Sequence, residues 1–210
     1  MTLIDSVLEH LDLEQIETNL FRGIPEALGP SRVFGGQVIG QALIAALRTI
    51  EGRPCHSLHG YFLRPGDPSI PIIYEVDRIR DGKSFTTRRV IAIQKGEAIF
   101  NMSASFQIFE DGLSHQIEMP DVPLPDDLPA EEEMFEKRKK DMTPEMIAMM
   151  KKDRPVEMKR VEDIDYLSPV KSDPVQHIWF KSKKKLGDDP AQHQCLLAYA
   201  SDMGLLSTAT

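Results

Sequence analysis

The sequence predicts an α+β protein in which a long antiparallel sheet wraps around one apolar helix. Three observations predict it. Residues 38–47 are apolar except for Gln41, four strand-like segments separated by turn residues fill 57–109, and a strand followed by an apolar helix recurs over 175–206. A helix that is apolar on all sides must be buried, and a sheet with one apolar face can bury it.

Composition excludes several classes of protein. The 210 residues carry 25 Lys+Arg against 33 Asp+Glu, a net charge of −8, so no general positive field attracts nucleic acid or an anionic membrane. No segment approaches the length of a membrane span or a signal peptide. Two cysteines are too few for a disulfide framework, and no Cys/His spacing fits zinc. We therefore expect a reduced, cytoplasmic protein without metal or cofactor.

The N-terminal half contains the elements that build the sheet and its helix. A short helix over 3–11 and a strand over 13–22 precede a loop rich in Gly and Pro. The central helix is expected over 33–50, and it opens with Gly35 and Gly36, which let other backbone approach and leave the first N–H groups accessible.

Four strands are expected after this helix, because alternating apolar residues are interrupted by turn residues such as Asp81-Gly82. These segments are 57–64, 70–80, 84–94 and 98–109. Residues 112–155 change character and predict a Pro-rich, acidic surface linker, followed by an exposed helix over 130–152 that Pro144 interrupts.

The second half begins like the first. Strands are expected over 156–163 and 175–182, and an Asp N-cap with Pro190 opens a helix over 191–206. The apolar helix stops without a cap, and the four strands that should follow are lacking, which predicts a chain truncated inside its second sheet-and-helix unit. The predicted domains are 1–111, a linker over 112–155, and 156–210.

Asp202 is the informative residue of the second helix. Its neighbours are apolar, and aligning Gln37 with Gln194 places Ala45 opposite Asp202, so the first helix has no matching acid. Burying a carboxylate costs several kcal/mol unless it is hydrogen-bonded or paired, which favours a functional role. The alternative is that Asp202 faces water at the end of the helix or caps a turn there.

Several segments together resemble the acyl-CoA thioesterase II family. They are Val33–Ala42, His59–Gly66, Arg80–Phe85, Arg88–Val90, Ser103–Gln107 and His193–Asp202, in that order along the chain. The resemblance implies a double hotdog fold, a homo-oligomer, and hydrolysis of acyl-CoA to a fatty acid and CoA. It also implies that Asp202 is catalytic and acts with a Gln and a Ser or Thr that would lie beyond position 210, so this chain alone is expected to lack two catalytic partners.

The hypothesis for the mechanism is that Asp202 accepts a hydrogen bond from a water molecule that attacks the thioester carbonyl. Gly35, Gly36 and Gln37 are candidates for oxyanion or pantetheine contacts, although close packing of helix and sheet is the favoured explanation of the glycines. His59 is a further candidate for substrate binding, against an ordinary strand histidine.

Other residues have simple structural explanations beside any functional one. The basic residues Lys181 and 183–185 could attract the CoA phosphates, or form a solvated loop. Cys55 and Cys195 are expected to be buried thiols. The arginines of the strands are expected to pair with acids across the sheet, namely Arg64, Arg88 and Arg89.

The sequence alone leaves two alternatives to a thioesterase open. A hotdog hydratase or dehydratase would use His193 with Asp202, but nine residues separate them along one helix. A non-catalytic acyl-CoA-binding or oligomerisation module would bind without turnover.

Overall fold

A computed structural model describes residues 11–25, 32–150, 154–165 and 170–204, and the helix expected over 3–11 lies almost wholly outside them. The described residues form two compact units. One comprises 11–112 and 186–203, and the other comprises 113–185 with residue 204.

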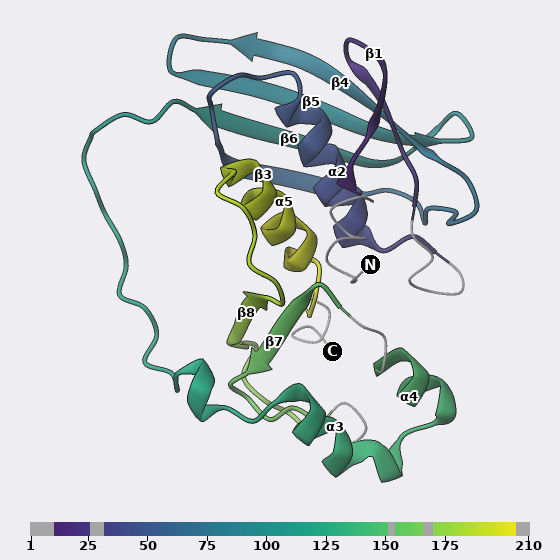
Figure 1. The fold of residues 1–210 in the computed structure, drawn as a ribbon, viewed down its shortest axis with the longest axis vertical. Coiled ribbons are helices and arrows are strands. Elements are labelled where there is room, and N and C mark those ends of the chain that lie inside the picture. The colour runs from purple at the N-terminus through teal and green to yellow at the C-terminus, as the bar shows by residue number, and fades with distance from the viewer. Residues whose placement is uncertain (1–10, 26–31, 151–153, 166–169, 205–210) are drawn as a thin grey trace. The chain divides into compact units, whose positions relative to one another are not determined.

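The first unit is built on a six-stranded antiparallel sheet with the strand order β1-β2-β4-β5-β6-β3 (Figure 1). Its strands are β1 (Glu14–Glu17), β2 (Leu20–Gly23), β3 (Cys55–Phe62), β4 (Ile72–Asp81), β5 (Phe85–Gln94) and β6 (Glu97–Gln107). The four strands predicted over 57–109 are confirmed, with ends that differ by at most two residues. The α+β class is confirmed as well.

The strand predicted over 13–22 is wrong in one respect, because the structure divides it into the β1–β2 hairpin. Thr18 and Asn19 form the turn, and the Asn19 carbonyl accepts a hydrogen bond from the Val76 N–H of β4. The Asn19 side chain also accepts one from Arg78, at 2.8 Å. The polar pair Thr18-Asn19, inside a segment that alternates imperfectly, is the sequence feature that corresponds to this turn.

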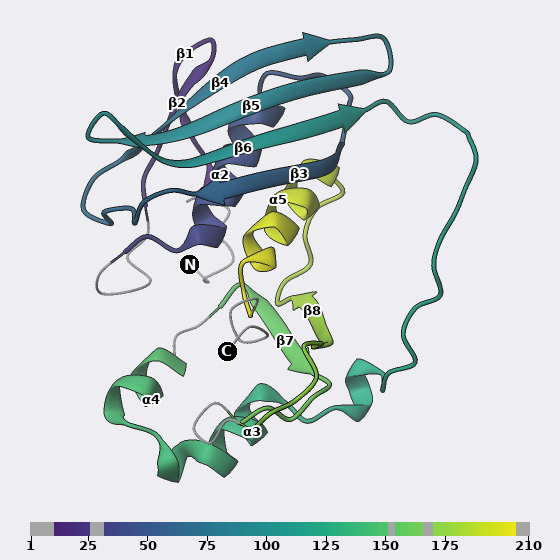
Figure 2. The ribbon, with the colours of Figure 1, turned by 180° about the vertical axis from the view of Figure 1, so that it is seen from behind.

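Helix α2 (Gly35–Leu47) lies against one face of the sheet, and α5 (Pro190–Ser201) packs beside it in the same unit, as Figures 1 and 2 show. Gln41, the polar residue of the apolar segment, is fully buried. Its side-chain oxygen accepts a hydrogen bond from the Tyr74 hydroxyl at 2.7 Å, and its amide donates to the Ile24 carbonyl. A buried amide is tolerated here because both of its ends are satisfied.

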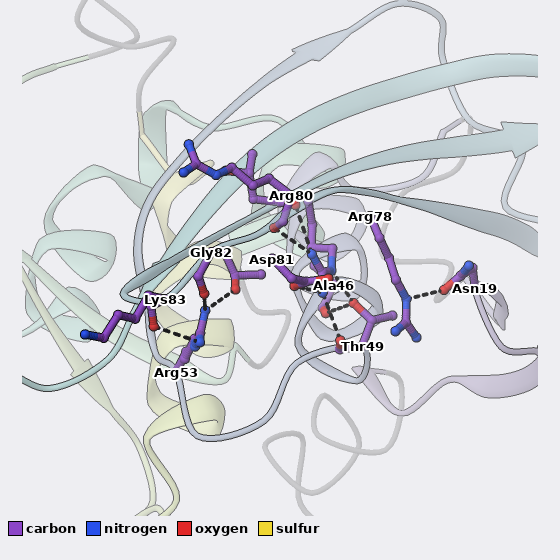
Figure 3. A network of polar contacts seen from close by, with 12 residues as sticks. Asn19, Ala46, Thr49, Arg53, Arg78, Arg80, Asp81, Gly82 and Lys83 are labelled. Atoms are coloured by element: carbon purple, nitrogen blue, oxygen red, sulfur yellow. Dashed lines mark hydrogen bonds and ion pairs between the residues drawn. The ribbon is translucent and has the colours of Figure 1, made fainter.

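The C-terminal end of α2 is held by a buried arginine of β5. Arg88 is 1% exposed and donates to the hydroxyl and the carbonyl of Thr49, and also to the Asp81 carboxylate at 2.7 Å. The Arg80 carbonyl accepts a further bond from it. Figure 3 shows Thr49, Arg80 and Asp81 in this network. The network joins the end of the helix to the β4–β5 turn, so Arg88 serves the fold.

All three arginines pair with acids, as predicted, although Arg64 lies two residues beyond the end of β3 and not on a strand. The pairs are Arg64–Glu97 at 3.5 Å, Arg88–Asp81 at 2.7 Å and Arg89–Asp77 at 2.9 Å.

Helix α5 begins as predicted and ends earlier. The Asp189 side chain caps it by accepting a hydrogen bond from the Ala191 N–H, and Pro190 occupies its first turn. The helix was expected to continue to residue 206, but it ends at Ser201 and Asp202 is its C-cap. Gly204 has a φ of 90°, a backbone conformation that an α-helix cannot contain, which accounts for the early end.

The second unit contains short helices and a two-stranded hairpin. Its elements are η1 (Pro125–Asp127), α3 (Glu131–Arg138), η2 (Lys139–Asp141), α4 (Pro144–Met150), β7 (Val156–Arg160) and β8 (Ile178–Ser182). The break predicted at Pro144 is confirmed, since α4 begins there. Both predicted strands form and pair with each other, although each is shorter than expected. Among the helices that the structure describes, none has the length and hydropathy needed to cross a bilayer.

Candidate active site

Asp202 lies where the C-terminal end of α5 meets the N-terminal end of α2. Its side chain is half-buried, and its carboxylate accepts a hydrogen bond from the Gly36 backbone N–H. The first N–H groups of a helix have no partner within the helix, and the helix dipole favours a negative charge beside them. The N-terminus of α2 therefore holds the carboxylate in one position.

Two glycines allow this approach. A Cβ built on Gly35 would lie 2.7 Å from Oδ2 of Asp202 and 2.6 Å from Cζ of Phe62. A Cβ built on Gly36 would lie 2.2 Å from the backbone oxygen of Tyr199 in α5. All three distances are shorter than real Cβ contacts, so any larger residue at either position would displace part of the site.

Three effects act on the charge of Asp202. Burial raises the pKa of its carboxyl above the ordinary aspartate value, while the Gly36 N–H and the nearby Arg32 guanidinium lower that pKa. Burial is the largest effect, so the direction of the shift is upward. A partly desolvated carboxylate with a raised pKa is a better proton acceptor than an exposed one, which suits a general base.

Aromatic side chains gather at the start of α2, where the carboxylate lies. The Phe34 and Tyr199 rings meet edge to face with centroids 5.0 Å apart, next to Gly36. The Phe62 and Phe100 rings lie 4.9 Å apart on the inner face of the sheet. The ring tip of Phe62 and Oδ2 of Asp202 both border the Cβ position of Gly35, so Phe62 is an apolar neighbour of the carboxylate.

Gln194 anchors α5 to the sheet. Its amide donates to the Cys55 carbonyl at 2.8 Å, and its oxygen accepts from the Cys55 N–H at 3.0 Å. The amide thereby pairs with both backbone groups at the start of β3, as a neighbouring strand would. Gln194 and Asp202 are eight residues apart on α5, so this anchor helps to set the position of the carboxylate.

Of the remaining candidate residues, some lie beside Asp202 and others lie elsewhere in the unit. Gly35 and Gly36 lie at Asp202, whereas the buried Gln37 side chain donates to the Ile24 carbonyl at 3.0 Å. His59 is exposed and stacks edge to face on Tyr61. Because side chains alternate along β3 and Phe62 faces α2, His59 lies on the outer face of the sheet, and the structure does not bring it to Asp202.

The other nucleophile and acid–base candidates lie apart from Asp202 or lack reactivity. Burial raises the pKa of the Cys195 thiol to about 12 and also raises that of Cys55. The His193 ring nitrogen contacts the Gly187 carbonyl at 2.7 Å, at the start of α5, roughly 13 Å along the helix axis from Asp202. A His–Asp pair for hydratase chemistry is therefore not formed on this helix.

A hollow of about 590 Å³ lies at the opposite end of the helix pair. Leu11, Ile44 and Cys195 are among the residues that line it, and Asp202 is not. Within the described residues, no group of three or more His, Cys, Asp or Glu side chains could hold a metal ion.

Three residues of this site are not marked by any pattern in the sequence. Phe62 was contained in the segment His59–Gly66, but nothing in its spacing indicated that its ring reaches α2. Gln194 served only to align the two helices, and its tie to Cys55 joins residues far apart in the chain. No motif or spacing in the sequence points to Arg32 as part of a site.

Two family models match the chain. The acyl-CoA thioesterase N-terminal domain matches residues 24–107, and the acyl-CoA thioesterase model matches residues 150–210. Among curated proteins, the chain is 38% identical to acyl-CoA thioesterase 2 of Haemophilus influenzae, covering 99% of this chain and 73% of the relative. It is also 38% identical to mouse acyl-coenzyme A thioesterase 8, covering 99% of this chain and 67% of the relative.

Solved structures are similar as well. An acyl-CoA thioesterase II from Mycobacterium marinum is 43% identical with a TM-score of 0.73, over 97% of this chain and 70% of the other. A conserved protein with a hot dog fold from Alicyclobacillus acidocaldarius is 21% identical with a TM-score of 0.69, over 96% of this chain and 69% of the other. The second likeness concerns the fold alone, and it agrees with the predicted hotdog architecture.

Proposed function

Because this chain belongs to the acyl-CoA thioesterase II family, we propose that it hydrolyses acyl-CoA thioesters to a carboxylic acid and CoA, with Asp202 as the base that activates water. The observation that carries the role of Asp202 is its position: a half-buried carboxylate at the C-cap of α5, held by the Gly36 N–H at the start of α2. A thioester carbonyl is electrophilic and its thiolate leaves readily, so an oriented water and a base can suffice.

In the proposed reaction, the ionised Asp202 accepts a hydrogen bond from water and takes its proton as the water oxygen attacks the carbonyl carbon. The C–O bond forms while the carbonyl π electrons move to the oxygen. The tetrahedral oxyanion then collapses, the C–S bond breaks, and the CoA thiolate leaves and is protonated. The net change is thioester plus water to carboxylic acid plus thiol.

The backbone at the start of α2 has two roles in this proposal. The Gly36 N–H orients the carboxylate, because it donates to it directly. Other N–H groups of the first helical turn point in the same direction and are candidates to stabilise the oxyanion. Gly35 leaves the space in which carboxylate and substrate meet.

The test is an assay of free thiol release from acyl-CoA by the full-length protein and its Asp202→Asn variant. Activity should fall by several orders of magnitude in this variant while folding is retained. Asp188→Asn is the matched control, since Asp188 is exposed just before α5. Near wild-type thiol release by Asp202→Asn would contradict the role of Asp202. Water addition without thiol release would indicate a hydratase, and binding without turnover a non-catalytic module.

The domain boundaries and the assembly form part of the same proposal. We place a first hotdog at 1–111, a linker at 112–155 and the beginning of a second hotdog at 156–210. The two family matches support this division, since they leave 108–149 between them. The chain spans 73% and 67% of the length of the two curated relatives described above.

We also propose a homo-oligomer, because hotdog sheets pair through edge strands and β3 is an edge of this sheet. Light scattering on the full-length protein would test it, and a monomer would contradict it. The cytoplasmic location stays a prediction.

A further inference from the structure

Phe62 is a large apolar residue that the fold holds in an exposed position beside the candidate catalytic carboxylate. Its relative exposure is 50%, and it ends β3, an edge strand of the sheet. The Cζ atom of its ring and Oδ2 of Asp202 each lie within 2.7 Å of the same point, the Cβ position of Gly35. The ring tip and the carboxylate are therefore neighbours across the missing side chain of Gly35.

The ring is fixed in this position from two sides. Phe100, 1% exposed, lies directly opposite Phe62 on β6, and their centroids are 4.9 Å apart. The Phe100 ring in turn fills the space over Gly60, where a Cβ would lie 2.6 Å from Cζ of Phe100. Phe62 packs on a buried neighbour and on the start of α2, so its ring is already ordered. Binding a ligand to the exposed side of the ring therefore costs little further side-chain entropy.

The position has a direct consequence for a bound thioester. A water that hydrogen-bonds to the Asp202 carboxylate must lie about 3 to 3.5 Å from the carbonyl carbon that it attacks. The groups bonded to that carbon then lie within van der Waals reach of a ring beside the carboxylate. One group is the sulfur of the polar pantetheine arm, and the other is the apolar acyl chain. An aromatic ring gains more from burial against methylene groups than against a hydrated amide arm.

We propose that Phe62 contacts the acyl chain at the carbons next to the thioester carbonyl and so sets the preference for acyl-chain length. This inference rests on the proposed function, because it assigns the substrate contact of the same site. Phe62 is thus a specificity-determining residue. Tyr61, its neighbour on β3, is 60% exposed but points to the opposite face of the sheet, where it packs on His59.

The test compares kcat/KM for acetyl-CoA and octanoyl-CoA in the full-length protein. Phe62→Leu should lower the ratio of octanoyl-CoA to acetyl-CoA activity by about tenfold, the scale that a few lost methylene contacts in a pocket produce. Phe62→Trp, which enlarges the ring, should shift the preference toward acetyl-CoA as well. Tyr61→Leu is the matched control and should leave the ratio unchanged, and inhibition by free CoA should be the same in all variants.

The possible results distinguish a failure of the Phe62 assignment from a failure of the proposed function. If the wild-type protein releases no thiol from any acyl-CoA, the proposed function fails first. If the wild type is active and Phe62→Leu lowers both activities equally, or neither, the assignment of Phe62 is overturned. An equal change in Tyr61→Leu would also overturn it, and a circular-dichroism melt confirms that each variant is folded.

Discussion

Replacing Gly35 by alanine should damage catalysis more than folding. The new Cβ would lie 2.7 Å from Oδ2 of Asp202 and 2.6 Å from the ring tip of Phe62. Both neighbours are ends of side chains, which can move without displacing a helix. The new methyl group therefore displaces the Asp202 carboxylate and the Phe62 ring, which the proposed chemistry uses, while the backbone of α2 and α5 stays in place.

The size of the effect follows from these distances. An ordinary contact of a Cβ begins near 3.4 Å, so the carboxylate oxygen must retreat by about 0.7 Å. A misplacement of roughly 1 Å costs up to about a hundredfold in rate, so kcat should fall by about ten- to a hundredfold. Overpacking costs about 1–3 kcal/mol of unfolding free energy, and movable neighbours favour the lower end of that range.

The assay combines thiol release from acyl-CoA with urea unfolding. Gly36→Ala provides the contrast, because its Cβ would lie 2.2 Å from the Tyr199 backbone oxygen and should mainly lower stability. Gly112→Ala is the neutral control, since a Cβ there would meet nothing within 4 Å. Full kcat in Gly35→Ala would refute the reasoning, as would a loss of unfolding free energy as large as that of Gly36→Ala.

Three further predictions concern stability, pH dependence and thiol reactivity. Arg88→Met should lower the unfolding free energy by about 1–3 kcal/mol in urea titrations, because it removes a donor from the buried Thr49 carbonyl. The exposed Arg89→Met should cost less than about 1 kcal/mol, and equal costs would contradict the buried network. Because ionised Asp202 is the active form and burial raises its pKa, kcat/KM should be lost as pH falls through a midpoint above that of an ordinary aspartate. Arg32→Gln should move that midpoint further upward by removing a cation that lowers the pKa, and a downward shift would disprove this. Burial raises the pKa of the Cys195 thiol to about 12, so this thiol should resist alkylation by iodoacetamide in the folded protein. Peptide mass spectrometry measures the alkylation, and rapid modification of Cys195 would refute its burial.

The sequence was sufficient for most elements because local patterns cause them. The apolar segment around Gln41 could only form a buried helix, and turn residues such as Asp81-Gly82 separated the strands. The errors lie where alternation was weak, at the Thr18-Asn19 turn, or where the pattern continued past the real end of α5 at Ser201. An apolar run does not report a helix end when the residues that follow are also apolar.

The sequence also identified Asp202 as unusual, because an acid among apolar neighbours is costly to bury. It left open whether the carboxylate meets water or protein. The answer depends on the Gly36 N–H, which lies more than 160 residues earlier in the chain. No local pattern can report such a contact, since the packing of α5 on α2 produces it.

The amino-acid order by itself determined the class of fold, the order of the elements and the family, because hydrophobic periodicity and short motifs are properties of neighbouring residues. Only the tertiary structure decided which groups meet: Phe62 and Gly35 beside Asp202, Gln194 on the Cys55 backbone, and His59 on the outer face. The physical reason is that side-chain direction on a strand and the distance between two helices are set by packing across the whole core, in which every missing or added methyl group changes what can touch.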